Sequence, residues 1–203
     1  MTEETPPELL CFSHLRWNFV YQRPQHLMSR YPGKVYYFEE PVHAEGNDGL
    51  RVSHPDDKNI IVVTPSLSTA LSENRDARLQ SLIDQFLQDE NINRFIAWYY
   101  TPMALKFTRQ LQPVLTVYDC MDELSNFKFA PTELRDLEAE LFNKADLCLQ
   151  EATTFTRLRK TCTRISIPFQ AASTRSILCR QGSRYRSRQI RHRSLIPASD
   201  IMA

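Results

Sequence analysis

The chain has 203 residues, of which 42% are hydrophobic and 24% are charged, and its formal net charge is +1. These values fit an ordinary soluble protein with one α/β domain, and no apolar run approaches the roughly 18 residues of a membrane span. The acidic extension at residues 1–7 lacks the cationic and apolar parts of a signal peptide, so we expect a cytoplasmic chain. Its five cysteines show neither CxxC nor zinc spacing and are expected to be reduced. Cys11 and Cys120 lie in strand-like runs and are expected to be buried apolar residues.

Short apolar runs alternate with helical patterns over the first 150 residues. Six of these runs are expected to be strands, namely residues 9–13, 35–39, 60–64, 95–99, 114–118 and 146–149. Strands that alternate with helices imply a parallel sheet covered by helices. The sequence therefore predicts an α/β domain with a parallel sheet over residues 8–149.

Helices are expected between these strands, where apolar side chains repeat at helical spacing. Clear amphipathic patterns cover residues 79–87 and 134–141, and each has charged or amide side chains on its opposite face. Shorter helices are expected after Pro24 and Pro102. The segment 43–58 is rich in Gly, Asn, Asp and Pro, which predicts an exposed loop.

The loop after the first expected strand is chemically the most distinctive segment. It carries two histidines, two arginines and a tryptophan: His14, Arg16, Trp17, Arg23 and His26. Ligands of α/β folds bind beyond the carboxyl ends of strands, so we expect these side chains to bind an anionic or hydroxyl-rich substrate. His14 is also a catalytic candidate. The alternative is a solvated loop whose aromatic residues merely pack.

Two further strand exits bring polar residues to the same edge of the predicted sheet. Tyr100 and Thr101 follow the fourth expected strand and are substrate-binding candidates. Asp119, Asp122 and Glu123 follow the fifth strand and could orient hydroxyls or act as a base, which makes them catalytic candidates without an assigned role. A divalent cation would also suit them, but no second carboxylate cluster completes a metal site. Turn formation and helix capping are the alternative for the two aspartates.

The common nucleotide-binding and hydrolase fingerprints are missing from the sequence. It contains no GxGxxG, no Walker lysine loop, no GxSxG and no HExxH, and only four glycines. We therefore expect neither a glycine loop that cradles phosphate nor a bound cofactor.

The net charge hides a strong asymmetry along the chain. Residues 1–150 hold 14 Lys and Arg against 22 Asp and Glu, whereas residues 151–203 hold 11 against 2. The basic part lacks helical spacing, strand alternation and interleaved aromatic residues. We expect residues 150–203 to be an Arg-rich, disordered tail.

Four segments resemble the N-terminal half of a bacterial group of GT-B glycosyltransferases, similar to families 1 and 4. They read CFSHLRW at 11–17, QRPQHL at 22–27, WYYTPMAL at 98–105 and YDCMDELS at 118–125. The resemblance extends over residues 9–147, which is most of the expected domain.

This resemblance implies an enzyme of two Rossmann-like domains that reacts in the cleft between them. The N-terminal domain would hold the sugar acceptor, and the C-terminal domain would bind the nucleotide-sugar, the co-substrate of a retaining transfer to a glycan or lipid. No essential metal is implied. Arg23 would hold the first helix or an anion, and the carboxylates of residues 119–123 would orient hydroxyls or brace the cleft loops. The family also implies polysaccharide biosynthesis at the inner face of the membrane.

The sequence departs from this family in its last fifty-odd residues, where the donor-binding domain is expected and does not follow. A reading-frame slip near residue 148 would explain the departure. With suitable synonymous codons, residues 150–182 are compatible with a second frame that contains a Gly-Gly strand exit and the family-like segment SSIDPQHF. Loss of one G after the codon of Leu147 would suffice. We therefore expect a truncated, frameshifted chain that is inactive alone.

A non-enzyme alternative remains open from the sequence. The chain could be a single-domain carbohydrate- or partner-binding protein whose basic tail contacts nucleic acid or an anionic membrane. Shifted codons also readily produce arginine, so no specific nucleic-acid partner is expected, and peripheral membrane association stays open. The sequence leaves the donor sugar, the acceptor and the oligomeric state unassigned.

Overall fold

A computed structural model describes residues 5–55, 59–69, 73–121, 131–151 and 166–169. The chain divides into two units, Met1–Gln170 and Ala171–Ala203, and every described residue belongs to the first. None of the described helices is long and apolar enough to cross a membrane.

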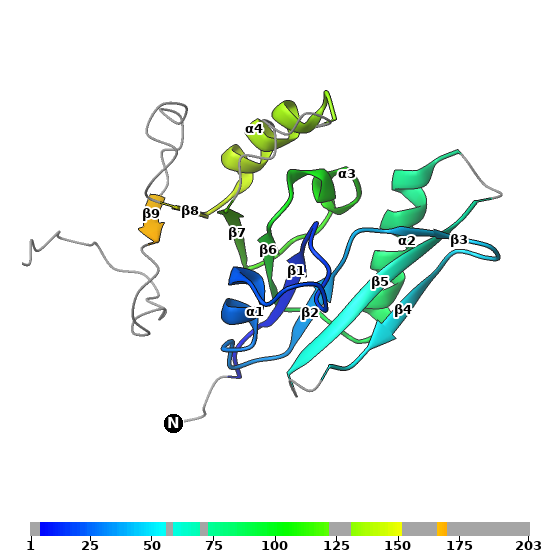
Figure 1. Ribbon diagram of the computed structural model, residues 1–203, viewed down its shortest axis with the longest axis horizontal. Helices are drawn as coiled ribbons and strands as arrows, with labels where there is room; N and C mark the ends of the chain where they lie inside the picture. Colours follow the sequence, from blue (N-terminus) through cyan, green and yellow to red (C-terminus); the bar gives the residue numbers. More distant parts are fainter. Residues whose placement is uncertain (1–4, 56–58, 70–72, 122–130, 152–165, 170–203) are drawn as a thin grey trace, which may run out of the picture. The chain divides into compact units, whose positions relative to one another are not determined.

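The described residues form one nine-stranded sheet (Figure 1). Its strands are β1 Glu8–Phe12, β2 Val35–Phe38, β3 Val42–Ala44, β4 Gly49–Ser53, β5 Ile60–Ser68, β6 Phe95–Tyr99, β7 Leu115–Cys120, β8 Leu147–Glu151 and β9 Ser166–Phe169. Their hydrogen-bonded order is β3-β5-β2-β1-β6-β7-β8-β9, and β4 pairs antiparallel with β5 while the other pairs are parallel. The expected α/β, Rossmann-like sheet is therefore confirmed, and all six expected strands are present.

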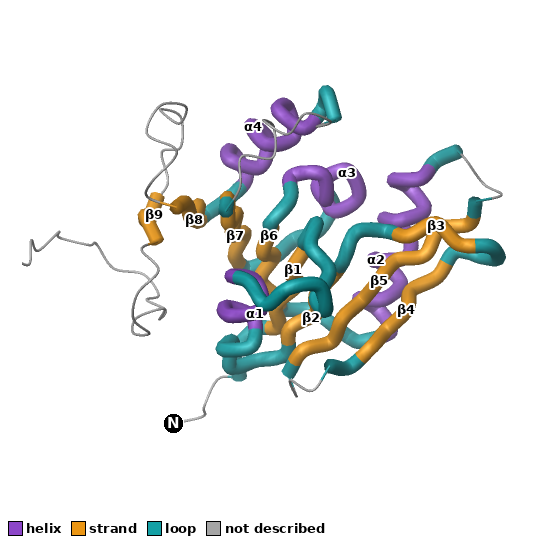
Figure 2. Tube along the Cα trace, viewed as in Figure 1, coloured by secondary structure: helices purple, strands orange, loops and turns teal. Residues whose placement is uncertain are grey.

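Helical segments connect these strands (Figure 2). They are α1 Arg23–Met28, α2 Arg75–Asp89, the 3-10 helix η1 Pro102–Ala104, α3 Leu105–Thr108 and α4 Leu134–Lys144. The two amphipathic helices and the two short helices at prolines are thus confirmed. Pro24 lies in the first turn of α1 and Pro102 begins η1, where a missing N–H donor leaves no helical bond unmade.

One face of the sheet packs against α2, α3 and α4, and we call it the three-helix face. Each helix packs on alternate strand residues, such as Leu10 and Tyr99, through an apolar side chain: Ile83 of α2, Leu105 of α3 and Leu141 of α4. All five residues are buried. Aromatic rings reinforce this face by stacking along neighbouring strands at centroid distances of 5.1 Å. Its core is a continuous apolar layer.

The opposite face packs against α1 and the loop that precedes it, and we call it the α1 face. Met28 and Trp17 cover the alternate strand residues, including Leu9, Tyr37 and Trp98. The Trp17 ring meets the Tyr37 ring edge-on at 5.0 Å. Because α1 has only six residues, the loop that precedes it completes the cover of this face. Polar groups reach the carboxyl end of the sheet at this loop.

The expectation of an exposed loop over residues 43–58 was wrong, because this segment contains β3 and β4. Phe38 pairs with Val63 and Val42 pairs with Ser66. The four residue steps from Phe38 to Val42 therefore lie opposite only three residue steps along β5. The strand β3 therefore continues β2 beyond a bulge. Both new strands are short and contain no buried residue, and they lack the apolar run on which the sequence prediction depended.

Part of the segment 150–203 is described as strand. The strand β8 continues to Glu151, and β9 pairs with it in parallel register from Cys148↔Ser166 onward. Pro168 is compatible with this place because β9 ends the described strand order, where a proline N atom need not donate to a neighbour. The remaining residues of the expected tail lie outside the described part.

Candidate functional site

Polar side chains gather at the carboxyl edge of the α1 face. Asp119, Ser13 and Glu39 follow Val117, Cys11 and Tyr37 by two positions, and the latter three belong to the α1-face core. Side chains two positions apart along a strand point to the same face. Because β2, β1, β6 and β7 are consecutive in the sheet, these residues form a row at the ends of β2, β1 and β7. We call this row and the loop above it the edge site.

A buried ion pair joins α1 to the end of β7. The Arg23 Nε atom donates to Asp119 Oδ2 at 3.1 Å, and its Nη2 atom lies 2.9 Å from Oδ1. The Arg23 side chain is 12% exposed and the Asp119 side chain is 0% exposed. Two parallel contacts between a guanidinium and a carboxylate fix both direction and distance. The pair thereby holds α1 against β7 across 96 positions of sequence.

Two buried acids near this pair stay protonated. Burial, and then the Asp119 charge, raise the pKa of the Tyr100 hydroxyl well above its usual range. The same two causes raise the pKa of the Cys11 thiol. Neither group therefore adds a negative charge beside Asp119. The Asp119 carboxylate is completely buried and paired with Arg23, so in this structure it holds the first turn of α1.

Glu39 holds the loop after β1, and sequence reasoning missed it. Its carboxylate accepts hydrogen bonds from Arg16 Nη1, the Trp17 backbone N–H and Thr64 Oγ1, each at 2.8 Å. Glu39 lies directly after β2, in the bulge before β3, on the same face as Tyr37. The only signal in the sequence was its place at a strand exit, because its three partners lie 22 to 25 positions away.

Two glutamines fasten the other end of this loop to the first turn of α1. The Gln22 backbone N–H donates to Gln25 Oε1 at 3.0 Å, and Gln25 Nε2 donates to the Trp17 carbonyl at 2.8 Å. Gln25 is 1% exposed, so both bonds are shielded from water. Trp17 and Gln22 are thus fixed points, and residues 18–21 between them are exposed.

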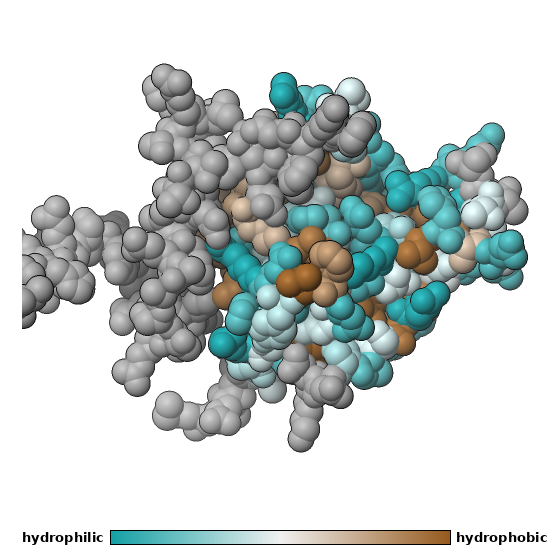
Figure 3. All heavy atoms as spheres, viewed as in Figure 1, coloured by the Kyte–Doolittle hydropathy of each residue, from teal (hydrophilic) through white to brown (hydrophobic). Residues whose placement is uncertain are grey.

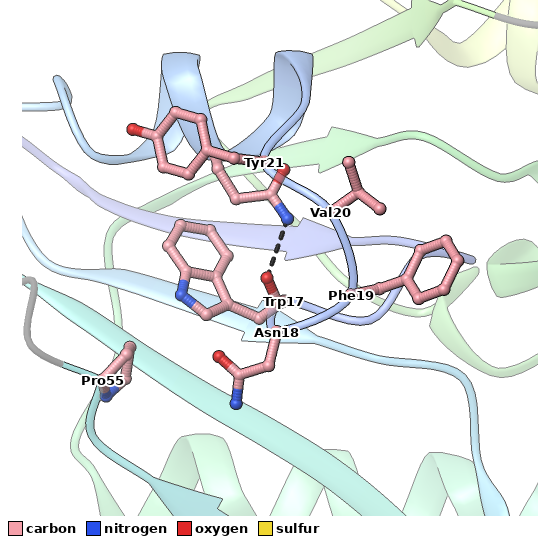
Figure 4. A pocket seen from close by; sticks show the side chains of 7 residues that line it. Trp17, Asn18, Phe19, Val20, Tyr21 and Pro55 are labelled. Atoms are coloured by element: carbon pink, nitrogen blue, oxygen red, sulfur yellow. Dashed lines mark hydrogen bonds between the residues drawn. The ribbon is translucent and has the colours of Figure 1, made fainter.

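A pocket of about 340 Å³ opens beside this loop (Figure 4). It is lined by Trp17, Asn18, Phe19, Val20, Tyr21, Gln25 and Pro55. In Figure 4 the side chains of Phe19 and Val20 point away from the Trp17 ring. The pocket therefore has a fixed aromatic floor and a rim of exposed side chains.

The structure brings most of the predicted first-loop residues to the edge site. Arg16 and Trp17 bind Glu39, Arg23 binds Asp119, and His14 is half-buried beside Ser13. His26 lies on the exposed side of α1, where its ring meets the Tyr21 ring at 4.5 Å.

The remaining candidates take different positions. Tyr100 and Thr101 are buried, and Thr101 Oγ1 accepts a hydrogen bond from the Met103 N–H at 3.3 Å, which caps η1. Asp122 and Glu123 lie outside the described residues. Among the residues that are described, no group of three or more His, Cys, Asp or Glu could hold a metal ion.

No protein-family model and no curated protein matches the sequence. One similar solved structure is described as trehalose-6-phosphate from E. coli bound with UDP-2-fluoro glucose, with a TM-score of 0.43 and 13% identity over 72% of this chain and 40% of that one. Another is an α,α-trehalose-phosphate synthase (UDP-forming) from Burkholderia xenovorans in complex with glucose-6-phosphate. Its TM-score is 0.42 at 10% identity, over 73% of this chain and 41% of that one. The chain thus spans about two fifths of the length of these structures.

Proposed function

We propose that this chain is the acceptor-side domain of a GT-B glycosyltransferase that uses a nucleotide-activated sugar. The observation that carries the proposal is the convergence of the four family-like segments at the edge site. Arg23 from the second segment pairs with Asp119 from the fourth, and Tyr100 from the third is buried near them. Segments that serve packing alone have no need to converge on charged groups at the carboxyl edge of a sheet.

Within this proposal the first loop binds the acceptor. The side chains of His14, Arg16 and His26 offer nitrogen donors to hydroxyl or phosphate groups of a glycan or lipid acceptor. Glu39 and Asp119 act as positioning residues, because Glu39 holds Arg16 of the loop and Asp119 holds Arg23 of α1. The nucleotide-sugar would be bound by a second domain, and retaining stereochemistry follows from the family resemblance.

The proposal includes a reading-frame slip near residue 148, after which the donor-binding domain would be encoded in the second frame. The charge asymmetry on either side of residue 150 and the legible second frame support it. The 203-residue chain alone would then bind acceptor without turning over a nucleotide-sugar.

The test is nucleotide release by the frame-restored protein. We expect release of a nucleoside diphosphate from one member of a nucleotide-sugar panel, dependent on an added glycan or lipid acceptor. Arg16→Ala should raise the acceptor KM, whereas Arg51→Ala, on the exposed strand β4, should leave it unchanged. A folded, frame-restored protein without release from any donor would contradict the proposal.

A second candidate function rests on the charge of residues 151–203, which contain 11 Lys and Arg and only 2 Asp and Glu. In this case the protein is a single-domain carbohydrate or partner binder, and its tail contacts anionic polymers or membranes. It predicts saturable, salt-sensitive binding without turnover, in the chain as it stands. Loss of that binding on deletion of residues 151–203, with no second frame in the gene, would favour this candidate.

A further inference from the structure

The pocket beside the loop between β1 and α1, which we call the loop pocket, extends away from the row of strand ends. Its floor is Trp17, whose ring packs on Tyr37 of β2. Pro55 also lines it and follows β4 at the end where Ser53 pairs with Val62, near the beginning of β5. The loop pocket therefore lies over β2 and β5, whereas the buried ion pair of the edge site lies at the end of β7.

None of the seven side chains that line the loop pocket is charged. Three are aromatic, two carry amides and two are apolar without an aromatic ring. At its rim Phe19 is 73% exposed and Tyr21 is 59% exposed, and Figure 3 shows hydrophobic surface at this loop, bordered by hydrophilic side chains. The nearby Arg16 is paired with Glu39. Because sites for phosphate and carboxylate groups depend on cationic side chains, this lining favours an uncharged ligand.

Two polar groups of the loop pocket are available to a ligand. Both amide atoms of Gln25 are already used, by the Trp17 carbonyl and the Gln22 N–H. Among the described residues, neither the Trp17 indole N–H nor the Asn18 side-chain amide has a hydrogen-bond partner. Trp17 is only 7% exposed, and in Figure 4 its indole nitrogen lies on the side of the ring toward Pro55. A buried donor without a partner costs free energy that a ligand oxygen would recover.

The backbone around the loop pocket is fixed before any ligand binds. The Trp17 N–H donates to the Glu39 carboxylate before the exposed residues 18–21, and the Gln22 N–H donates to Gln25 after them. A site that is already formed loses little conformational entropy on binding. Weak contacts with a small ligand therefore suffice for measurable affinity.

We propose that the loop pocket binds a neutral sugar ring of a glycan. A pyranose has an apolar C–H face that packs against aromatic rings, and hydroxyls at its edge that pair with N–H and amide groups. The volume of about 340 Å³ lies at the lower end of the range for ligand pockets, roughly 300–1,000 Å³, which suits a mono- or disaccharide better than a peptide segment. This inference rests on the proposed function and deepens it, because it gives the acceptor an uncharged sugar unit outside the row of strand ends.

The test follows the two indole N–H signals of the complete chain in nitrogen–proton correlation spectra. The chain has two tryptophans: Trp17 lines the loop pocket, and Trp98 lies on β6 beside Tyr100. The variants Trp17→Phe and Trp98→Phe identify the signals. The probes are neutral di- and trisaccharides of glucose, galactose, mannose and N-acetylglucosamine, each compared with its phosphorylated counterpart. We expect a saturable shift of the Trp17 signal with at least one neutral probe, a smaller shift of the Trp98 signal, and several-fold weaker binding of the phosphorylated form.

Titrations of two variants then locate the sugar. Tyr21→Ala and Asn18→Ala remove an aromatic surface and an amide at the exposed rim, and each should raise the Kd about two- to tenfold. Asn47→Ala, at an exposed position before β4, is the matched control and should leave the Kd unchanged. An unchanged Kd in both rim variants would overturn the proposal, as would a Trp17 signal that no neutral probe shifts.

The remaining outcomes separate this inference from the proposed function. A shift confined to the Trp98 signal would place the sugar at the edge site, which overturns the inference and leaves the glycosyltransferase standing. A Trp17 shift together with no nucleotide release by the frame-restored protein would support the inference and contradict the glycosyltransferase. A Trp17 signal that moves with protein concentration alone, and not with sugar, would assign the loop pocket to a second copy of the chain and overturn the inference.

Discussion

The two faces of the sheet are built from different chemistry, although they share the same strands. The three-helix face joins α2, α3 and α4 to the strands through an apolar layer. The α1 face has a six-residue helix and a loop as its cover, and it buries the Arg23–Asp119 pair and the Glu39 carboxylate at its carboxyl edge. Apolar burial supplies most folding free energy, and buried charges add little net stability but fix geometry. The comparison therefore assigns stability to the first face and a positioned site to the second.

The largest expected effect comes from removing one partner of the buried pair. Asp119→Ala leaves the Arg23 guanidinium in its 12% exposed position without this carboxylate, which should reduce the free energy of unfolding by about 3–5 kcal/mol. Urea denaturation measures the loss. The double variant Arg23→Met with Asp119→Leu should recover most of it, since no charge then stays buried. If the double variant does not recover the loss, the pair itself contributes stability. That result would contradict our view that the pair mainly fixes geometry.

A comparable loss is expected on the three-helix face, but without any effect on the edge site. Ile83→Ala removes a fully buried side chain of α2 and should reduce the free energy of unfolding by about 2–5 kcal/mol. Leu82→Ala, at a half-buried position of the same helix, is the matched control and should have a smaller effect. In native-state hydrogen exchange, the difference between the free energy of exchange of the Trp17 amide and the free energy of global unfolding should stay unchanged. Selective loss of protection there would show that the faces are coupled.

A smaller loss of stability and a local loosening are expected from Glu39→Gln. The substitution removes the charge that Arg16 Nη1 and the Trp17 N–H bind. A single hydrogen bond to a charged group contributes up to about 1.5–3 kcal/mol of stability. We expect a global loss of about 1 kcal/mol together with faster proteolysis at residues 18–21. Glu40→Gln, at the exposed neighbouring position, should change neither measurement. Unchanged proteolysis in Glu39→Gln would remove Glu39 from its positioning role.

The smallest effect is expected for an ion pair on the surface. Arg109 donates to Glu140 through two nitrogens at 2.7 Å, with side chains 51% and 40% exposed. Arg109→Ala should reduce the free energy of unfolding by less than about 1 kcal/mol, because water and salt screen exposed charges. Thermal or urea unfolding at low and high salt checks this value. A loss as large as that of Asp119→Ala would show that burial does not distinguish the two pairs.

The sequence predicted the parts of the fold in which apolar periodicity dominates. The six core strands and the helices α2 and α4 follow from runs and spacings of apolar residues. The strands β3, β4 and β9 did not follow, because they are short and gain their order by pairing with a neighbour. Such pairing depends on residues far away in sequence, which single-sequence patterns do not contain.

The same limit applies to the edge site. The sequence correctly brought polar strand exits to one edge, because parallel strands share their direction. It could not tell that Asp119 is buried against Arg23, since 96 positions separate them. In the sequence, Glu39 is only the last residue of an expected strand. Its role depends on the bulge between β2 and β3, which is itself a product of tertiary pairing.

The proposed glycosyltransferase depends most directly on whether a donor-binding domain is encoded beside this one. The measurement is the DNA sequence of the gene, from the codon of Pro131 to well beyond that of Ala203. The account predicts a second frame that opens near the codon of Leu147 and continues through Ser-Ser-Ile-Asp into a second Rossmann-like domain. A gene without such a frame would contradict it and would make the basic segment of residues 151–203 a genuine part of the protein.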